Sequence, residues 1–348
     1  MQDKAIAAIG EWQLNENKDL EPVDLYIENM FPDKDYQLLV LVFEITKDDG
    51  SLKCLYNGID VEKVSSSNYS KYAYRKGSPN GGDITFTTKV SKPDPKKIEK
   101  PEDNPVHKKL NSIEKRFKGL IDNKDFPEES AVFKLIYQTF INEKQSIKKG
   151  LLDIVDNLDK DTAKVTGITL KIFDGKNERF LRDFDSIKEA ILVSAEEKKY
   201  IRSSPKAESK ASNQICSVTG VREKSILGFA APFSYSTPDK PGFVSNFFNI
   251  NFNWKNYPIS SDAALKLELG SRFIMENLTA SFYGYRYLII PNPIIDTDSK
   301  QLKKIIKHLK SAIIEEKNSR EKKKGAEDRV LKIIGAENNT NYFNLDIA

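Results

Sequence analysis

Residues 71–82 combine residue types that together suit binding to nucleic acid. The segment contains three basic residues, two tyrosines and three glycines, and it contains no acidic residue. Basic side chains neutralise phosphates, aromatic rings stack on bases, and glycines let backbone N–H groups approach a ligand. The candidate contact residues are Tyr72, Tyr74, Arg75, Lys76, Gly77, Ser78, Asn80 and Gly81.

Each residue type in this segment has its own predicted role. Arg75 and Lys76 suit contacts with phosphates, which position a protein on DNA without reading its sequence. The rings of Tyr72 and Tyr74 suit stacking, and Asn80 suits reading a base edge or wedging at a base step. The alternative is a long hairpin loop in which Asn-Gly-Gly supplies positive φ and the tyrosines cover a sheet. The sequence alone leaves both interpretations open.

A second basic surface is predicted on a helix at residues 299–321. Its apolar residues recur at helical spacing, and its lysines occupy the opposite face. The lysines expected to contact nucleic acid or an acidic partner non-specifically are Lys303, Lys304 and Lys307.

Catalytic side chains are scarce in this chain. It has two histidines, His107 and His308, and it lacks the Gly-rich phosphate-binding motifs and the metalloprotease motif HExxH. Asp296 and Asp298 would hold a divalent ion together with one more carboxylate, but Asp298 stands where a helix needs an N-cap. We therefore predict a protein without catalytic residues, metal or cofactor.

The charge of the chain is unevenly distributed. The net charge is +4, yet residues 1–49 hold four lysines against twelve acidic residues, and residues 300–324 hold ten basic against three acidic residues. Residues 89–124 form another basic stretch, with eleven basic against six acidic residues. Parts of the surface can thus engage phosphate. The 39% of hydrophobic residues excludes a fully disordered chain.

Patterns of apolar residues predict an α+β fold that begins with a sheet. Strands are expected at residues 36–45, 51–60, 83–90 and 166–173, and helices at residues 106–120, 128–142 and 186–195. Residues 203–212 read as a polar loop. A buried helix at residues 262–279, capped by Ser260 or Ser261, is followed by a strand at residues 285–290 that Pro291 should end.

Three domains are predicted from these elements. Residues 1–202 form a sheet-based part with helices, residues 203–293 an aromatic-rich region, and residues 294–348 a basic helix and the chain end. The longest apolar run spans residues 38–43, too short for a transmembrane helix, and two cysteines suit a reducing compartment. We therefore expect a cytoplasmic protein without a membrane partner.

Several motifs together resemble the large subunit of type I-B CRISPR Cascade complexes. They occupy residues 215–220, 235–243, 254–265 and 282–291, and residues 72–77 are also similar to that family. The resemblance spans residues 71–293, and since the family is usually longer, we expect the chain to be an N-terminal part.

The resemblance bears directly on metal binding. Family members carry two Cys pairs that bind structural zinc, and the matching positions here are Cys216, Thr219, Ser260 and Ala263. A tetrahedral zinc site needs four donors, and only one of these positions supplies a thiol. The region is therefore expected to be a degenerate zinc finger without zinc.

The resemblance implies a non-catalytic subunit of a crRNA-guided interference complex. Such a subunit binds crRNA and other Cascade subunits, recognises the protospacer-adjacent motif in duplex target DNA, and helps to form the R-loop. A helicase-nuclease recruited in trans would cut the DNA. After residues 71–82, Lys240 is the next expected contact. The alternatives are a carboxylate-metal nuclease built on Asp296 and Asp298, and a protein-binding scaffold that does not contact nucleic acid.

Overall fold

Two compact units make up the chain. The computed structural model describes residues 2–18, 20–32, 34–48, 51–77, 82–94, 100, 103–175, 177–203, 206–233, 249–282, 285–293, 299–318 and 343–347. One unit comprises Glu21–Ala195, and the other comprises Met1–Leu20 together with Glu196–Ala348. The predicted α+β class is confirmed, because helices and mixed or antiparallel sheets occur together.

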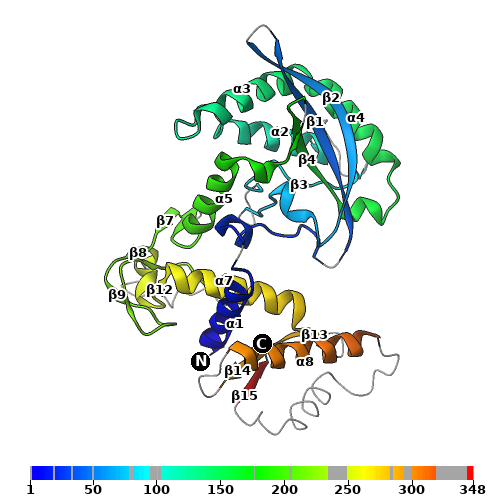
Figure 1. The fold of residues 1–348 in the computed structure, drawn as a ribbon. Helices are drawn as coiled ribbons and strands as arrows, with labels where there is room; N and C mark the ends of the chain where they lie inside the picture. Colours follow the sequence, from blue (N-terminus) through cyan, green and yellow to red (C-terminus); the bar gives the residue numbers. More distant parts are fainter. Residues whose placement is uncertain are drawn as a thin grey trace. The chain divides into compact units, whose positions relative to one another are not determined.

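The Glu21–Ala195 unit is built on a five-stranded mixed sheet (Figure 1). Strands β1 (Tyr36–Asp48) and β2 (Ser51–Val64) form the predicted antiparallel hairpin. Strand β4 (Thr166–Phe173) lies parallel to β1, and the short strands β3 (Thr88–Lys89) and β5 (Glu178–Arg179) pair with β4 in antiparallel fashion. The sheet order is β2-β1-β4-β3.

Strand β1 is buried on both faces, as its continuous apolar run predicts. Leu39, Leu41 and Phe43 join the core beneath the helices, whereas Leu38 and Val40 join a second core on the opposite face. This alternation follows from the two-residue period of a strand. The second face is the one that Tyr72 and Tyr74 cover.

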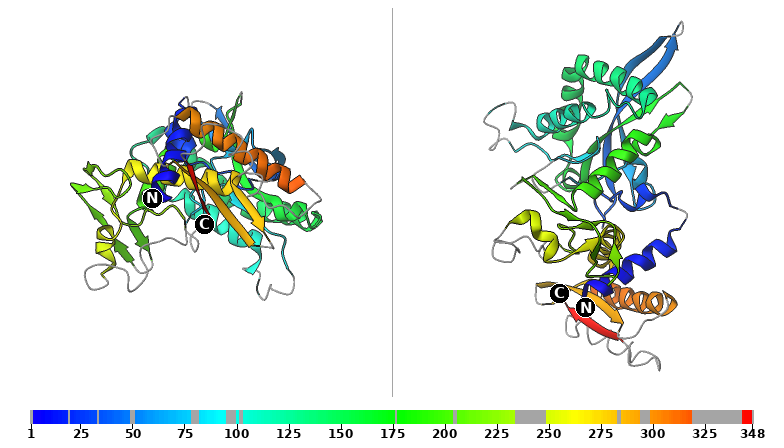
Figure 2. Two further views of the ribbon diagram at one scale, coloured as in Figure 1. Left: turned by 90° about the horizontal axis from the view of Figure 1, so that it is seen from below. Right: turned by 90° about the vertical axis from the view of Figure 1, so that its left-hand side faces the viewer.

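Four helices pack on the first face of this sheet (Figures 1 and 2). They are α2 (Pro105–Phe117), α3 (Pro127–Asn142), α4 (Lys144–Asn157) and α5 (Asp185–Glu197). Three of them are predicted by the sequence, and α4 is the addition. It buries Ile147, Leu151 and Val155, which recur every four residues along one face.

The other unit joins both ends of the sequence. Helix α1 (Gln2–Glu16) packs against α7 (Ser261–Asn277), and it also contacts α8 (Ser299–Asn318) and β14 (Tyr285–Pro293). Strand β14 pairs with β13 (Thr279–Phe282) and with β15 (Phe343–Ile347), and Figure 2 shows α8 beside this sheet. The predicted N-cap is confirmed, because the Ser260 hydroxyl accepts a bond from Ala263 N.

Short strands and a helical turn complete this unit. They are β6 (Ile201–Ser203), β7 (Lys206–Glu208), β8 (Lys210–Ala211), β9 (Gln214–Ile215), β10 (Arg222–Glu223), β11 (Ile226–Leu227), β12 (Ile259–Ser260) and the 3₁₀ helix η7 (Ile250–Lys255). No helix in the described part of the chain is long and apolar enough to cross a membrane.

Three sequence-based assignments are wrong. Residues 203–212 contain strands rather than a loop, because β8 pairs with the distant β11. Strand β14 continues through Pro291, which pairs with Leu345 instead of ending the strand. Of the strand expected at residues 83–90, only Thr88 and Lys89 form a strand. Thr85 and Thr87 donate from their hydroxyls to the carbonyls of Ala73 and Tyr72.

Candidate nucleic-acid interface

Residues 72–75 are held inside the Glu21–Ala195 unit by their own carbonyl groups. The hydroxyls of Thr87 and Thr85 donate to the carbonyls of residues 72 and 73. Glu28 N donates to the next carbonyl at 2.8 Å, and Ile84 N donates to that of Arg75 at 2.9 Å. Every carbonyl of this stretch is therefore fixed to a neighbouring segment.

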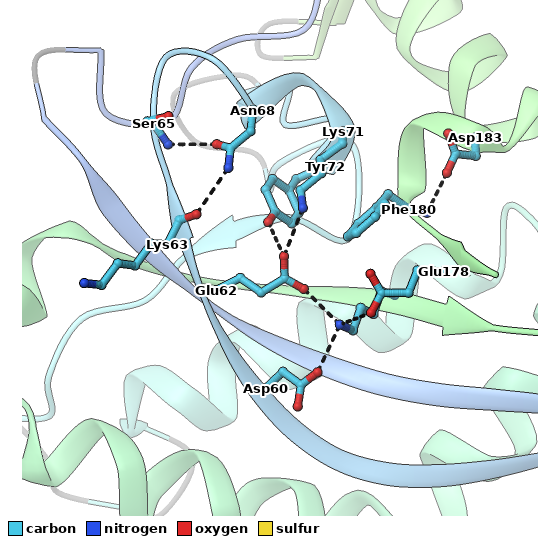
Figure 3. Close-up of polar contacts among 11 residues, drawn as sticks. Asp60, Glu62, Lys63, Ser65, Asn68, Lys71, Tyr72, Glu178, Phe180 and Asp183 are labelled. Carbon is cyan, nitrogen blue, oxygen red and sulfur yellow. Dashed lines mark hydrogen bonds and ion pairs between the residues drawn. The ribbon is translucent and has the colours of Figure 1, made fainter. Parts of the chain in front are cut away.

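The side chain of Tyr72 belongs to a polar network under the same stretch (Figure 3). Its hydroxyl donates to Glu62 at 2.5 Å, and Lys71 pairs with the same carboxylate at 3.1 Å. Lys171 contacts Glu62 at 3.0 Å, and it also contacts Asp60 and Glu178, which point toward the same ammonium in Figure 3.

The charges in this network stabilise one another. Burial raises the pKa of Glu62, but hydrogen bonds from Tyr72, Lys171 and Lys71 outweigh it, and the pKa lies below its usual value. Burial lowers the pKa of Lys171, but hydrogen bonds to three carboxylates outweigh this effect and raise it. Glu62 and Lys171 are therefore both ionised at neutral pH, and the network ties β2, β4 and residues 71–72 together.

Arg75 has a structural role as well. Its guanidinium pairs with Glu28 at 3.0 Å, donates to the carbonyl of Tyr26 at 3.1 Å, and lies over the Tyr26 ring. These contacts join residues 26–28 to the start of the loop. The side chain is 6% exposed.

The predicted contacts of three residues do not agree with these positions. Tyr72 is 1% exposed, Tyr74 is 4% exposed and Arg75 is 5% exposed. A ring or guanidinium so deeply buried cannot stack on a base or reach a phosphate while the fold is intact. The physical reason is that the second face of the sheet needs an apolar cover, which the tyrosines supply, and the structural interpretation of these residues holds.

Arg75→Ala should therefore act on folding rather than on binding alone. Removing the guanidinium leaves Glu28 and a backbone carbonyl without their partner, which should lower the free energy of unfolding by about 1–3 kcal/mol. Thermal unfolding followed by circular dichroism measures this loss. Lys76→Ala is the control, because its side chain is exposed and its loss should leave the melting temperature nearly unchanged. Equal melting temperatures of the two variants would contradict the structural role of Arg75.

Beyond Arg75 the backbone at Gly77 lies close to the backbone at Gly82. The backbones at Gly77 and Gly82 approach so closely that a Cβ atom on Gly77 would overlap the carbonyl of Gly82. Arg116 donates from Nε to the carbonyl of Asp83 at 2.6 Å and braces the returning strand of the loop. Ser78, Asn80 and Gly81 lie outside the described residues. The described neck holds their attachment points together.

Basic residues surround this neck. Lys76 and Lys89 are exposed, and Lys109 on α2 donates to the hydroxyl of Thr88 at 3.0 Å. Burial lowers the pKa of Lys89, the positive charge of Lys76 lowers it further, and the carboxylates of Asp83 and Glu28 act in the opposite direction. Arg116 completes the set from the same helix. The cations beside the neck therefore share this surface with the carboxylates of Asp83 and Glu28.

Lys89, Lys109 and Arg116 were not among the predicted contacts. A signal for two of them was present, because Lys109 and Arg116 are seven residues apart and therefore share one face of α2. Both residues are far from residues 76–82 in the sequence, so the sequence does not show that they lie near this loop. We now include these residues in the candidate interface.

The basic face of α8 forms as predicted. Lys303, Lys304 and Lys307 are exposed, and the buried residues of this helix are Leu302, Ile305, Ile306, Leu309 and Ile313. Lys303 also pairs with Glu16 of α1 at 2.5 Å. Whether this face contacts nucleic acid stays a prediction. Lys240, Asp296 and Asp298 lie outside the described residues.

The structure brings the four expected zinc-ligand positions together. Cys216 is fully buried, and its Sγ accepts a hydrogen bond from Ser260 N at 3.4 Å. Gly220 N bonds the carbonyl of Cys216 at 2.8 Å and Gly220 has φ +71°, so the turn through Thr219 is tight. Ala263, on α7, is fully buried and forms part of the same core.

Hydrogen bonds take the place of further thiol ligands around Cys216. Burial raises the pKa of Cys216, but bonds from Ser260 and Thr219 outweigh it and lower the pKa. Among the residues that the structure describes, no three His, Cys, Asp or Glu side chains gather into a metal-binding group. That purified protein holds no zinc stays a prediction.

Two family models match the sequence. The N-terminal domain of CRISPR-associated protein TM1802 matches residues 4–193, and the central domain of the same protein matches residues 213–346. A search of curated proteins found no match. The chain belongs to the TM1802 family of CRISPR-associated proteins, which is the type I-B large-subunit family that its motifs resemble.

Proposed function

We propose that this chain is a non-catalytic subunit that recognises the protospacer-adjacent motif of duplex DNA with residues 76–82. The observation that carries the proposal is the closed neck at Gly77 and Gly82, flanked by the cations of Lys76, Lys89, Lys109 and Arg116. The fixed neck offers the side chains of the segment between its two ends to a groove of the duplex, and cations beside the neck contact the phosphates.

In this proposal one residue of the loop reads the base sequence, and lysines beside the neck bind phosphates. Asn80 offers a donor and an acceptor that suit a base edge, whereas Lys76 and Lys109 hold phosphates irrespective of sequence. Base pairing between crRNA and the target strand then reads the remaining sequence. The lysines of α8 add a non-specific contact with DNA or with another Cascade subunit.

The wider role follows from the family. A large subunit of a crRNA-guided complex works beside crRNA and other Cascade subunits in the cytoplasm, supports R-loop formation, and leaves cutting to a recruited helicase-nuclease. Two unclustered histidines agree with a subunit that performs no chemistry itself. Metal-dependent cleavage of DNA by the purified chain, lost on replacing Asp296 and Asp298 by Ala, would favour the nuclease alternative instead.

The test distinguishes a residue that reads the base sequence from residues that bind only phosphates. Asn80→Ala should weaken binding to a motif-bearing duplex by about tenfold or more and change binding to a motif-less duplex little. The Lys76→Ala, Lys109→Ala double variant should weaken binding to both duplexes evenly, and the salt slope should fall by about two. Binding of both duplexes by the crRNA-loaded complex at two salt concentrations measures these effects.

Lys118→Ala is the matched control. Lys118 is an exposed lysine directly after α2, two residues from Arg116 and therefore on another side of the helix. Its loss should change neither the affinity nor the salt slope appreciably. If the Asn80 and lysine variants bind both duplexes as the wild type does, recognition lies elsewhere and the proposal is wrong.

A further inference from the structure

Three cations lie over four aromatic rings in the unit that contains the degenerate zinc finger. Lys210 lies 4.5 Å from the Tyr200 ring centre, and Arg202 lies 5.9 Å from that of Phe229. Lys255 lies 4.7 Å from the ring centre of Phe252 and 5.7 Å from that of Trp254. We call these three cations and four rings the aromatic shelf.

The backbone at Ser209 joins the segments that carry the shelf. Ser209 N donates to the carbonyl of Tyr200 at 2.8 Å, and Gly228 N donates to the carbonyl of Ser209 at 2.8 Å. The Ser209 hydroxyl accepts a bond from Trp254 N at 3.0 Å. The aromatic shelf therefore stands around one hydrogen-bonded centre, although residues 200 and 254 are far apart in the sequence.

The rings of the aromatic shelf are only partly buried in the core of the unit. Tyr200 and Trp254 pack against the core of the unit with part of their surface, whereas Phe229 and Phe252 are half-buried and belong to no described core cluster. Burying such rings completely would be favourable. Half-exposed phenyl rings next to cations are the arrangement that proteins use to stack single-stranded bases.

The charge of this region also suits a polyanion. Among the described residues of 198–233 and 249–257, eight are basic and two are acidic. Lys210 and Lys255 are exposed, and neither forms an ion pair with a carboxylate of the described chain. A phosphate of a ligand can therefore supply the negative charge opposite these two lysines.

Acidic residues restrict where the ligand is held most strongly. The pKa of Tyr200 is raised by burial and by the negative charges of Glu197, Glu196 and Glu208. These carboxylates repel an anion bound near Tyr200. The Phe252–Lys255 end of the shelf is therefore the stronger part of the site.

We propose that the aromatic shelf binds a single-stranded nucleic acid. Bases stack on Phe252 and Phe229, and the flexible lysine side chains move from the rings to the adjacent phosphates. A duplex is unsuitable as the ligand, because its base faces are already stacked on one another. This site is in a different unit from the loop at residues 76–82, so its test does not depend on that loop.

Oligonucleotides with and without bases test this assignment. The full chain should bind a dT20 strand about tenfold more tightly than an abasic strand of the same length, because only the first can stack. Phe252→Leu keeps an apolar side chain but removes the ring. It should remove most of this difference and leave binding to the abasic strand unchanged. A U20 strand, measured in parallel, shows whether DNA or RNA is preferred.

The lysines should behave differently from the rings. The Lys210→Ala, Lys255→Ala double variant should weaken binding to both the dT20 and the abasic strands, with a salt slope smaller by about 1.4. Lys224→Ala, which removes an exposed lysine without a ring partner in the described chain, is the control and should change the slope little.

Two results would overturn the assignment. One is equal binding of dT20 and the abasic strand by the wild type, and the other is an unchanged preference for dT20 in both Phe252→Leu and Phe229→Leu. The second ring variant is included in case the first one fails to fold. Unchanged tryptophan emission shows that a variant is folded. The Lys76→Ala, Lys109→Ala variant should keep the preference for dT20, so failure of the loop proposal is recognised separately.

Discussion

Replacing Lys171 by Met should lower the free energy of unfolding of the Glu21–Ala195 unit by about 2–3 kcal/mol. The ammonium is 8% exposed and lies within 3.0 Å of Asp60, Glu62 and Glu178. Breaking a fully buried pair costs about 3–5 kcal/mol, and the exposure of Asp60 and Glu178 to solvent reduces this value. Met keeps the apolar stem and removes the charge.

The pH dependence should change as well as the stability. In the wild type the pKa of Glu62 is lowered, so its stabilising effect is present above about pH 4.3 and is lost as the pH falls through the folded value. The pKa of Lys171 is raised, so its contribution is complete below about pH 10.4. Between these limits the network contributes a constant amount.

The Lys171→Met variant leaves three carboxylates facing one another. Protonating one of them relieves the repulsion, so lowering the pH from 7 to 5 should stabilise the variant relative to the wild type. Thermal unfolding by circular dichroism at a series of pH values measures this difference. A parallel pH dependence in both proteins would contradict the network.

Two further variants control this experiment. Lys164→Met breaks the exposed pair with Asp161, whose side chains are 71% and 92% exposed, and should cost about 0.5 kcal/mol or less. Adding Glu62→Gln to Lys171→Met removes one repelling charge and should recover part of the lost stability. Both tryptophans, Trp12 and Trp254, lie in the other unit, so their emission should follow an unchanged transition.

Gly270→Ala should destabilise the unit that contains both chain ends by about 3 kcal/mol or more. Helices α1 and α7 touch through their backbones, because a Cβ atom on Gly270 would overlap the carbonyl of Ile6, and one on Gly10 would overlap that of Lys266. Backbone atoms cannot move aside as a side chain can. The helices would separate and expose Ile6 and Ile9, which are fully buried.

Gly150→Ala is the matched control for this prediction. Gly150 also lies inside a helix, so both substitutions gain about 1 kcal/mol of helix propensity. A Cβ atom on Gly150 would lie 3.0 Å from Cδ1 of Ile59, which is the movable end of a side chain. This variant should be neutral or slightly stabilised.

Tryptophan emission measures the Gly270→Ala effect directly. Trp12 lies on α1, with its ring centre 5.2 Å from that of Phe273 on α7, so its emission should shift when the helices separate. The unfolding transition of the other unit, followed by circular dichroism, should stay in place. Equal stability of Gly270→Ala and Gly150→Ala would show that the helices do not touch as described.

Much of the secondary structure was predictable because its signals are local. The apolar run of β1, its hairpin partner β2, the strand β4 and the capped helix α7 each depend on residues within a few positions of one another. The family resemblance was also readable from the sequence, and the family models confirm it. The position of a basic, glycine-containing loop at residues 76–82 could likewise be predicted from the sequence.

Which side chains of that loop are exposed was decided only by the tertiary structure. Tyr72 and Arg75 have the composition of a binding site, but partners at Glu62 and Glu28 bury them. Lys109 and Arg116 reach the loop neck only because α2 packs against the same sheet. In the same way α1 completes a core with α7, about 250 residues away in sequence. Burial depends on contacts between distant segments, whereas composition and periodicity report only the preference of each segment by itself.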